Sequence, residues 1–230
     1  MNTRAVTAAL AAAAVAGMFG CGGKEAKDKP VPAAVAPDTV ADVPDKAANT
    51  VTYTLGTFTD KRDGKTYKKV EIGGQVWMAE NLNYAAKGSV CYDNYAENCT
   101  EYGRLYDWNT ALKVCPVGTH LPTDKEWTAL TDYVGGSKTA GTKFKSISGW
   151  YNNGNGIDEY GFSTLPGGYC YIGDFGLAGF NGYWWSSTEN DAGVAWYRNM
   201  GCYNEYVGRF NYDKNYLMSV RCVQDKEGEQ

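Results

Sequence analysis

Three aromatic residues stand side by side in the segment Asn181–Asn190, and hydroxyl, carboxylate and amide side chains follow them directly. Rings that stack on the faces of sugars, together with polar groups that bind sugar hydroxyls, suit a carbohydrate-binding surface. The same segment also suits a core β-strand. Successive side chains of a strand point to opposite faces, so Tyr183 and Trp185 would face one side and Trp184 the other. We therefore expect one of the two tryptophans in the core and the other elsewhere.

Two further segments have a composition that suits ligand binding. Gly149–Gly161 is rich in asparagine and glycine, although a turn-rich connection has the same composition. Gly167–Gly182 is a longer glycine-rich segment that we expect to be a loop, and long loops inside compact domains are often functional. The candidate ligand-binding residues are Trp150, Tyr151, Asp174, Phe175 and Trp184, with Glu189 and Asn190 as polar partners.

The sequence contains no complete catalytic or metal-binding constellation. Carboxylates at 158–159 and at Glu189 and Asp191 could form an acid–base pair for glycoside cleavage, but nothing in the sequence fixes their separation. His120 is the only histidine and precedes a predicted helix cap, so we expect a structural role for it. The absence of any C-x-x-C pair argues against a zinc site. We predict no catalytic residue, no metal and no cofactor.

Two helices are expected to position these segments. In Tyr102–Pro116 apolar residues recur at helical spacing, and Pro116 ends the helix. Its predicted buried face comprises Leu105, Trp108, Leu112 and Cys115. The second helix lies in Pro122–Gly136, where Thr123 and Glu126 predict a capping box. Its predicted buried stripe comprises Trp127, Leu130 and Val134.

The rest of the domain is expected to be β-structure. A hairpin is predicted around Gly73–Gly74, and several later runs are rich in aromatic and β-branched residues. Two helices combined with short strands predict an α+β fold.

Six cysteines follow Cys21, and an even number in an exported domain suggests three disulfides among 15 possible connectivities. Cys222 faces the core in the last predicted strand and Cys115 lies on the buried face of the first helix, which favours a Cys115–Cys222 bridge. Cys91 and Cys99 are near enough in sequence to pair. The remaining predicted pair is Cys170–Cys202.

The N-terminal residues predict export and anchoring. Met1–Gly20 has a single charge, Arg4, before an uncharged run too short and too rich in alanine for a membrane span. Met18–Cys21 resembles a lipobox, which would make Cys21 the lipidated first residue of the mature protein. Gly22 at the next position resembles the signal for release to the outer membrane, so we expect a membrane partner through the lipid.

A change in composition near residue 52 predicts a domain boundary. The residues from Lys24 to about Thr52 include four of the seven prolines and no aromatic residue, which predicts a disordered spacer. The predicted divisions are a signal peptide (1–20), an anchored linker (21–52), one folded domain (53–226) and a tail (227–230). The formal net charge of −4, more negative once Arg4 is removed, argues against a nucleic-acid partner.

Four segments in this order resemble the Fibrobacter succinogenes major paralogous domain. They are 103–130, 161–169, 184–190 and 219–223, and the resemblance covers roughly Thr57 to Asp225. The resemblance implies an exported or lipid-anchored bacterial protein with a disulfide-stabilised fold distantly similar to C-type lectins, with a long irregular loop region. It also places Trp185 in the core, because Trp185 matches the tryptophan of the family's W-S-S-T motif.

The sequence lacks the key residues of two kinds of protein with a similar fold. Calcium-dependent lectins carry E-P-N or Q-P-D in the long loop and W-N-D on a later strand, and neither motif occurs. Formylglycine-generating enzymes share the broad fold and use a reactive cysteine pair near the C-terminus, where this chain has only Cys222.

These observations predict a surface interaction module anchored in the outer membrane and without enzymatic activity. Its expected partner is a polysaccharide or another envelope protein. A display scaffold without a small ligand is the alternative, and a carbohydrate-active or formylglycine-generating-like enzyme is the third.

Overall fold

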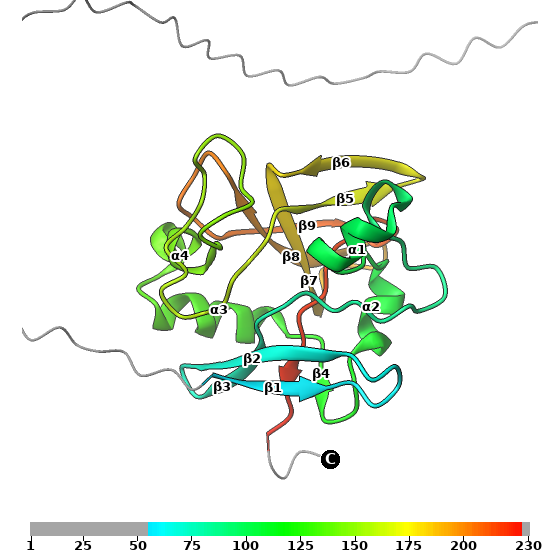
Figure 1. Cartoon of the computed structure of the whole chain (residues 1–230), viewed down its shortest axis with the longest axis horizontal. Coiled ribbons are helices and arrows are strands. Elements are labelled where there is room, and N and C mark those ends of the chain that lie inside the picture. Colours follow the sequence, from blue (N-terminus) through cyan, green and yellow to red (C-terminus); the bar gives the residue numbers. More distant parts are fainter. Residues whose placement is uncertain (1–54, 227–230) are drawn as a thin grey trace, which may run out of the picture. The chain divides into compact units, whose positions relative to one another are not determined.

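The first sheet brings together the two ends of the described chain (Figure 1). The computed structural model describes residues 55–226, and its first sheet has five antiparallel strands in the order β1-β2-β3-β10-β4. The strands are β1 (Leu55–Thr59), β2 (Thr66–Ile72), β3 (Gln75–Met78), β10 (Val223–Gln224) and β4 (Thr119–His120). The predicted hairpin around Gly73–Gly74 is confirmed as the β2–β3 turn.

The second sheet is built from the C-terminal half of the domain. Its order is β6-β5-β7-β8-β9, and only the β5–β7 pairing is parallel. The strands are β5 (Gly167–Tyr171), β6 (Asp174–Ala178), β7 (Asn181–Glu189), β8 (Val194–Gly201) and β9 (Gly208–Asp213). The prediction of a long loop over 167–182 is wrong, because these residues form the β5–β6 hairpin and the start of β7.

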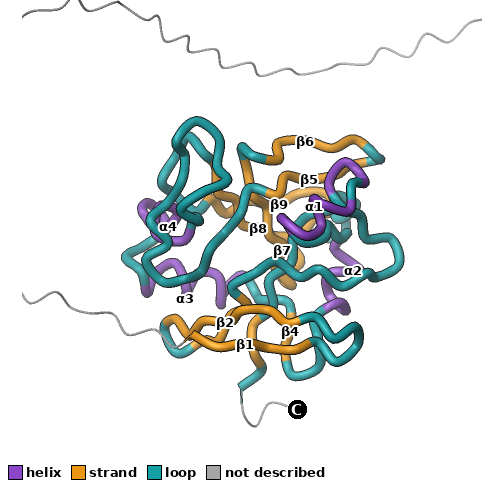
Figure 2. The backbone as a smooth tube through the Cα atoms, viewed as in Figure 1, coloured by secondary structure: helices purple, strands orange, loops and turns teal. Residues whose placement is uncertain are grey.

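Four α-helices and one 3-10 turn lie among the described residues, so the fold is α+β as predicted (Figure 2). They are η1 (Tyr92–Asn94), α1 (Ala96–Tyr102), α2 (Trp108–Val114), α3 (Asp124–Tyr133) and α4 (Ser137–Phe144). The capping box of α3 is confirmed: Thr123 Oγ1 accepts from the Glu126 N–H at 3.2 Å, and Glu126 Oε2 accepts from the Thr123 N–H at 2.7 Å.

The first predicted helix is shorter than expected. Residues 103–107 are extended between α1 and α2, and Leu105 pairs with Val90 in a β-bridge. Gly103 has a φ of +75°, and a Cβ there would lie 2.8 Å from the Cβ of Asn81. The chain therefore turns at Gly103 against the segment that follows β3. Leu112 is 38% exposed, so its assignment to the buried face is wrong.

Strand β7 separates two hydrophobic cores. Trp184 lies in the first core with Trp127 of α3 and Phe144 of α4, whereas Trp185 lies in the second core with Trp108 of α2. Both tryptophans are 0% exposed. The assignment of Trp185 to the core is confirmed. The expectation that only one of the pair is buried is wrong, because helices cover both faces of β7.

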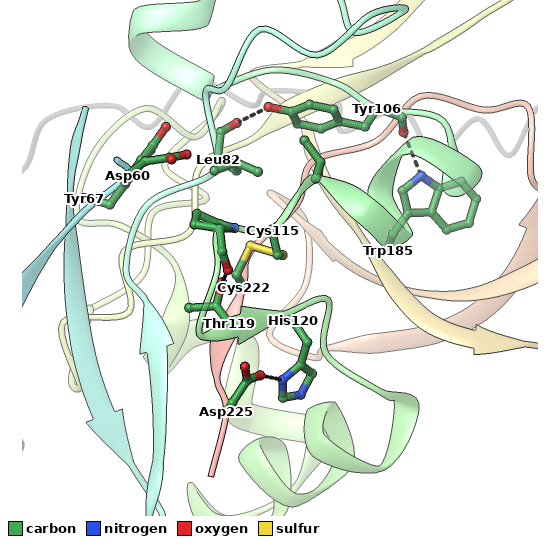
Figure 3. Close-up of a disulfide and its surroundings, with 12 residues drawn as sticks. Asp60, Tyr67, Leu82, Tyr106, Cys115, Thr119, His120, Trp185, Cys222 and Asp225 are labelled. Atoms are coloured by element: carbon green, nitrogen blue, oxygen red, sulfur yellow. Dashed lines mark hydrogen bonds and ion pairs between the residues drawn. A yellow bond between two sulfur atoms is a disulfide. The ribbon is translucent and has the colours of Figure 1, made fainter. Parts of the chain in front are cut away.

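Two of the three predicted disulfides form. Cys91–Cys99 closes a short loop, and Cys115–Cys222 joins the end of α2 to the C-terminal segment beside the first sheet (Figure 3). Cys170 and Cys202 are free and buried, so the predicted third bridge is wrong. Cys170 pairs through its backbone with Leu217, while the backbone N–H of Cys202 bonds to Phe180. Burial raises the pKa of both thiols.

The predicted signal peptide, linker, Cys21 and tail lie outside the described residues. Within residues 55–226 no helix is long and apolar enough to cross a membrane. The two disulfides fit a domain that folds outside the cytoplasm, since such bonds persist in oxidising compartments.

Removal of the long-range disulfide should strongly destabilise the domain. Cys115 and Cys222 are 107 residues apart, so the double change to alanine is expected to lower the free energy of unfolding by about 5 kcal/mol through loop entropy. Cys91 and Cys99 are 8 residues apart, and the same treatment there should cost about 2.5 kcal/mol. Denaturant titration of both variants measures the difference; equal losses would contradict the loop-entropy account.

Candidate functional site

Two of the candidate ligand-binding residues belong to the core. Trp150 is 4% exposed and donates its ring N–H to Ser146 Oγ at 3.1 Å and to the Thr164 carbonyl at 3.0 Å. Trp184 is fully buried and donates to Asn81 Oδ1 at 2.8 Å. The prediction that these two rings contact a ligand is therefore wrong, because each satisfies its polar atom inside the protein.

The other candidates lie in three separate places. Tyr151 is exposed on the loop that follows Trp150. Asp174 and Phe175 begin β6, where the Phe175 ring contacts that of Tyr92 of η1. Glu189 ends β7 and pairs with Lys214, and Asn190 follows it in the turn toward β8. The structure does not bring these residues together into one site.

A hollow lined by aromatic side chains lies elsewhere on the second sheet. It has a volume of about 270 Å³, and its lining comes from β5, β6, β7, β8, β9 and the segment after β9. We call it the tyrosine hollow, and its lining residues are Tyr169, Leu177, Tyr183, Tyr197, Tyr212, Tyr216 and Met218.

The tyrosine rings contact one another in a continuous row. Tyr216 lies 4.5 Å from Tyr212 and 5.4 Å from Tyr169 between ring centroids. Tyr169 lies 5.6 Å from Tyr183, which lies 5.9 Å from Tyr197. Several of these pairs are edge-to-face or tilted, which are favourable arrangements for aromatic rings. Ring-to-ring packing across four strands and the following segment therefore holds the wall of the hollow in place.

The hollow is uncharged. None of its seven lining residues carries a formal charge. Burial raises the pKa of Tyr197 to about 12, and burial likewise raises the pKa of Tyr183 and of Tyr216. These phenols are neutral over the physiological range, so each hydroxyl can both donate and accept a hydrogen bond. The hollow can therefore offer ring faces and neutral polar groups to a ligand.

Sequence reasoning missed this site. Tyr169 and Tyr171 alternate along β5, but Tyr171 does not line the hollow, and β7, β8 and β9 contribute one lining tyrosine each. The lining tyrosines come together only in the folded sheet, where β5 pairs with β7 in parallel as well as with β6 in the hairpin. Periodicity within one strand does not reveal that pairing.

His120 contacts two carboxylates from other parts of the chain. Its Nδ1 lies 2.7 Å from Asp225 Oδ1 (Figure 3), and its Nε2 lies 2.9 Å from Glu126 Oε1. The Glu126 hydrogen bond is the main cause that raises the pKa of His120 to about 9, against a smaller opposing effect of burial. The imidazolium thus links β4 to the start of α3 and to the residue after β10.

The described residues contain no group of three or more His, Cys, Asp or Glu side chains that could hold a metal ion. The carboxylates considered for acid–base chemistry are engaged separately: Asp158 accepts hydrogen bonds from Ser163, and Glu189 pairs with Lys214.

A family model described as the Fibrobacter succinogenes major domain matches residues 70–224. The matched range includes both disulfides and every residue that lines the tyrosine hollow. No curated protein and no solved structure matches the chain.

The His120 ion pairs should make stability depend on pH with a definite sign. The pKa of His120 is raised from 6.5 to about 9, so its contribution is complete below pH 6.5 and is lost as the pH rises through about 9. The pKa of Glu126 is lowered from 4.5 to about 2, although burial opposes this, because His120 and Thr123 donate to its carboxylate. Its contribution is complete above pH 4.5 and is lost as the pH falls through about 2.

The measurement is the free energy of unfolding of the parent and of His120→Gln across this pH range. The parent's advantage should be largest between pH 4.5 and 6.5 and should shrink toward pH 9. His120 is 39% exposed, so solvent screening should keep the advantage at about 1 kcal/mol or less. A difference that stays constant from pH 6 to pH 10 would refute the charged assignment.

Proposed function

The chain belongs to the Fibrobacter succinogenes major domain family, and on that premise we propose that it is a non-enzymatic interaction module of the bacterial envelope that binds a polysaccharide. The observation that carries the proposal is the tyrosine hollow, where five tyrosines from separate strands and loops converge. Convergent aromatic and polar groups in a concave site are the usual basis of a small-ligand site.

The chemistry of the hollow favours a neutral sugar over a charged or purely apolar ligand. A sugar ring has an apolar face that can stack on a tyrosine and hydroxyls that can bond to phenols. An anionic ligand would find no cationic group in the lining, and a purely apolar one would make no use of the hydroxyls. The ligand class we propose is therefore an uncharged polysaccharide.

The proposed setting is the outer membrane. Cys21 is the proposed lipidation site, the residues after it are the proposed tether, and the domain is proposed to be C-type-lectin-like. The combination of disulfides with a lipobox-like segment supports an envelope location. A display scaffold without a small ligand is the alternative.

Truncation of a single exposed ring of the hollow should weaken binding without unfolding the protein. Tyr212 is 47% exposed, so Tyr212→Ala is expected to reduce retention on an immobilised neutral polysaccharide about tenfold. Tyr212→Phe keeps the aromatic ring and loses only the hydroxyl, so its retention should lie between that of the parent and that of the alanine variant. Affinity electrophoresis of the full chain in gels that contain cellulose derivatives, xylan, mannan or mixed-linkage glucan measures retention, and ionic strength should change it little.

Tyr95→Ala is the matched control, because Tyr95 is 65% exposed and lies outside the hollow. The retention of this control should equal that of the parent. Equal retention of parent and Tyr212→Ala would place the ligand elsewhere. If no polysaccharide retains the parent, the ligand class is wrong, and an envelope protein or the scaffold role takes its place.

The anchor gives a separate prediction. If Cys21 carries lipid, Cys21→Ser should move the protein from the washed membrane fraction to the soluble fraction, because the hydrophobic anchor is lost. Immunoblotting of fractionated cells that express parent or variant measures the shift. Persistence of the serine variant in washed membranes would refute lipidation without bearing on the hollow.

A further inference from the structure

A second aromatic surface lies on the loops next to the second sheet. We call it the platform and define it by Tyr151, Phe180 and Tyr203. The Tyr151 and Phe180 ring centroids lie 4.5 Å apart with an interplanar angle of 32°, and Tyr203 lies 6.5 Å from Phe180. Tyr151 is 55% and Tyr203 69% exposed, so the outer two rings are open to solvent.

The platform is held in place by its surroundings. Tyr151 donates its backbone N–H to the Gly179 carbonyl at 2.7 Å, and the preceding Trp150 is buried with both ring-nitrogen contacts inside the core. Gly154 lies so close to Cys202 that a Cβ would be 2.3 Å from the Cys202 carbonyl oxygen. Exposed rings on a backbone held by such contacts lose less conformational entropy when a ligand binds than rings on a free loop do.

The platform and the tyrosine hollow pack against different cores: Phe180 packs against the first core, and Tyr183 and Tyr197 pack against the second. The Leu177–Phe180 turn leads from one to the other. Leu177 lines the hollow, and Phe180 is the central ring of the platform. The Phe180 N–H donates to the Leu177 carbonyl at 3.1 Å. In such a turn the first and fourth Cα atoms lie within about 7 Å. The exposed amides of Asn152 and Asn153 follow Tyr151 directly.

We infer that the platform is a second subsite for the same polysaccharide, which reaches it from the hollow across the Leu177–Phe180 turn. This inference rests on the proposed function and adds to it that the ligand is a chain of several sugar residues. The rings provide stacking faces and the neighbouring amides provide hydrogen-bonding groups, the same chemistry as in the hollow. Two adjoining subsites act on one chain with a high effective concentration, so affinity should rise with chain length.

The test uses oligosaccharides of increasing length, from dimer to hexamer, of the cello-, xylo- and manno- series. Isothermal titration calorimetry compares the parent full chain with the Tyr151→Ala/Tyr203→Ala variant. For the parent the hexamer should bind more tightly than the dimer. For the platform variant hexamer binding should fall about tenfold while dimer binding stays within about twofold, because the dimer occupies the hollow alone.

Two further variants separate the outcomes. Tyr133→Ala removes a ring that is 58% exposed on α3 and should match the parent at every length. Tyr212→Ala should weaken dimer and hexamer alike. If the platform variant binds the hexamer as the parent does, or loses dimer and hexamer equally, the second subsite is refuted and the hollow stands. If the parent binds none of the oligosaccharides, both proposals are overturned.

Discussion

One buried side chain, the amide of Asn81, connects the two sheets. Its Oδ1 accepts from the Trp184 ring nitrogen at 2.8 Å and from Arg221 Nε at 3.0 Å, and its Nδ2 donates to the Tyr102 carbonyl at 2.8 Å. The guanidinium of Arg221 is 1% exposed, and burial lowers its pKa to about 9. Its remaining donors bond to the Phe162 and Ser163 carbonyls. An unsatisfied buried polar group costs about 1–3 kcal/mol, so this network fixes one arrangement of β7, the C-terminal segment and the end of α1.

That arrangement explains why both tryptophans of β7 are buried. Trp184 must point toward Asn81, and the alternation of a strand then directs Trp185 to the opposite core, where its ring nitrogen bonds to the Tyr106 carbonyl at 2.9 Å (Figure 3). The Cys115–Cys222 disulfide fastens that second core from the side of α2. Strand β7 is thus a central strand covered on both faces, and its aromatic sequence is largely a packing requirement.

The features predicted correctly from the sequence are those that a few identifiable residues determine. The capping box of α3, the β2–β3 turn and the covalent link from Cys115 to Cys222 all follow from a few residues. Helix α4 was missed because Ser137–Phe144 is polar and contains Gly141, whose missing Cβ allows the carbonyls of Glu205 and Tyr206 to approach. The hollow was missed because its tyrosines are distant in sequence and meet through the strand order β5-β7-β8-β9, which includes the parallel β5–β7 pairing. Trp150 was misassigned because the composition of a loop does not show which of its aromatic rings are buried and which are exposed.

Buried tryptophans lie next to more exposed tyrosines at two places in the domain. Trp150 is buried and holds its loop, while the adjacent Tyr151 is exposed and donates its backbone N–H to the Gly179 carbonyl. On β7 the buried Trp184 and Trp185 likewise follow the half-buried Tyr183 of the hollow. In both places the tryptophan ring packs in the core and its ring nitrogen bonds inside the protein. The neighbouring tyrosine has an apolar ring and a hydroxyl that suits contact with water. Under the proposed function, we therefore expect ligand preference to change with substitutions at the exposed tyrosines, while the buried tryptophans maintain the fold.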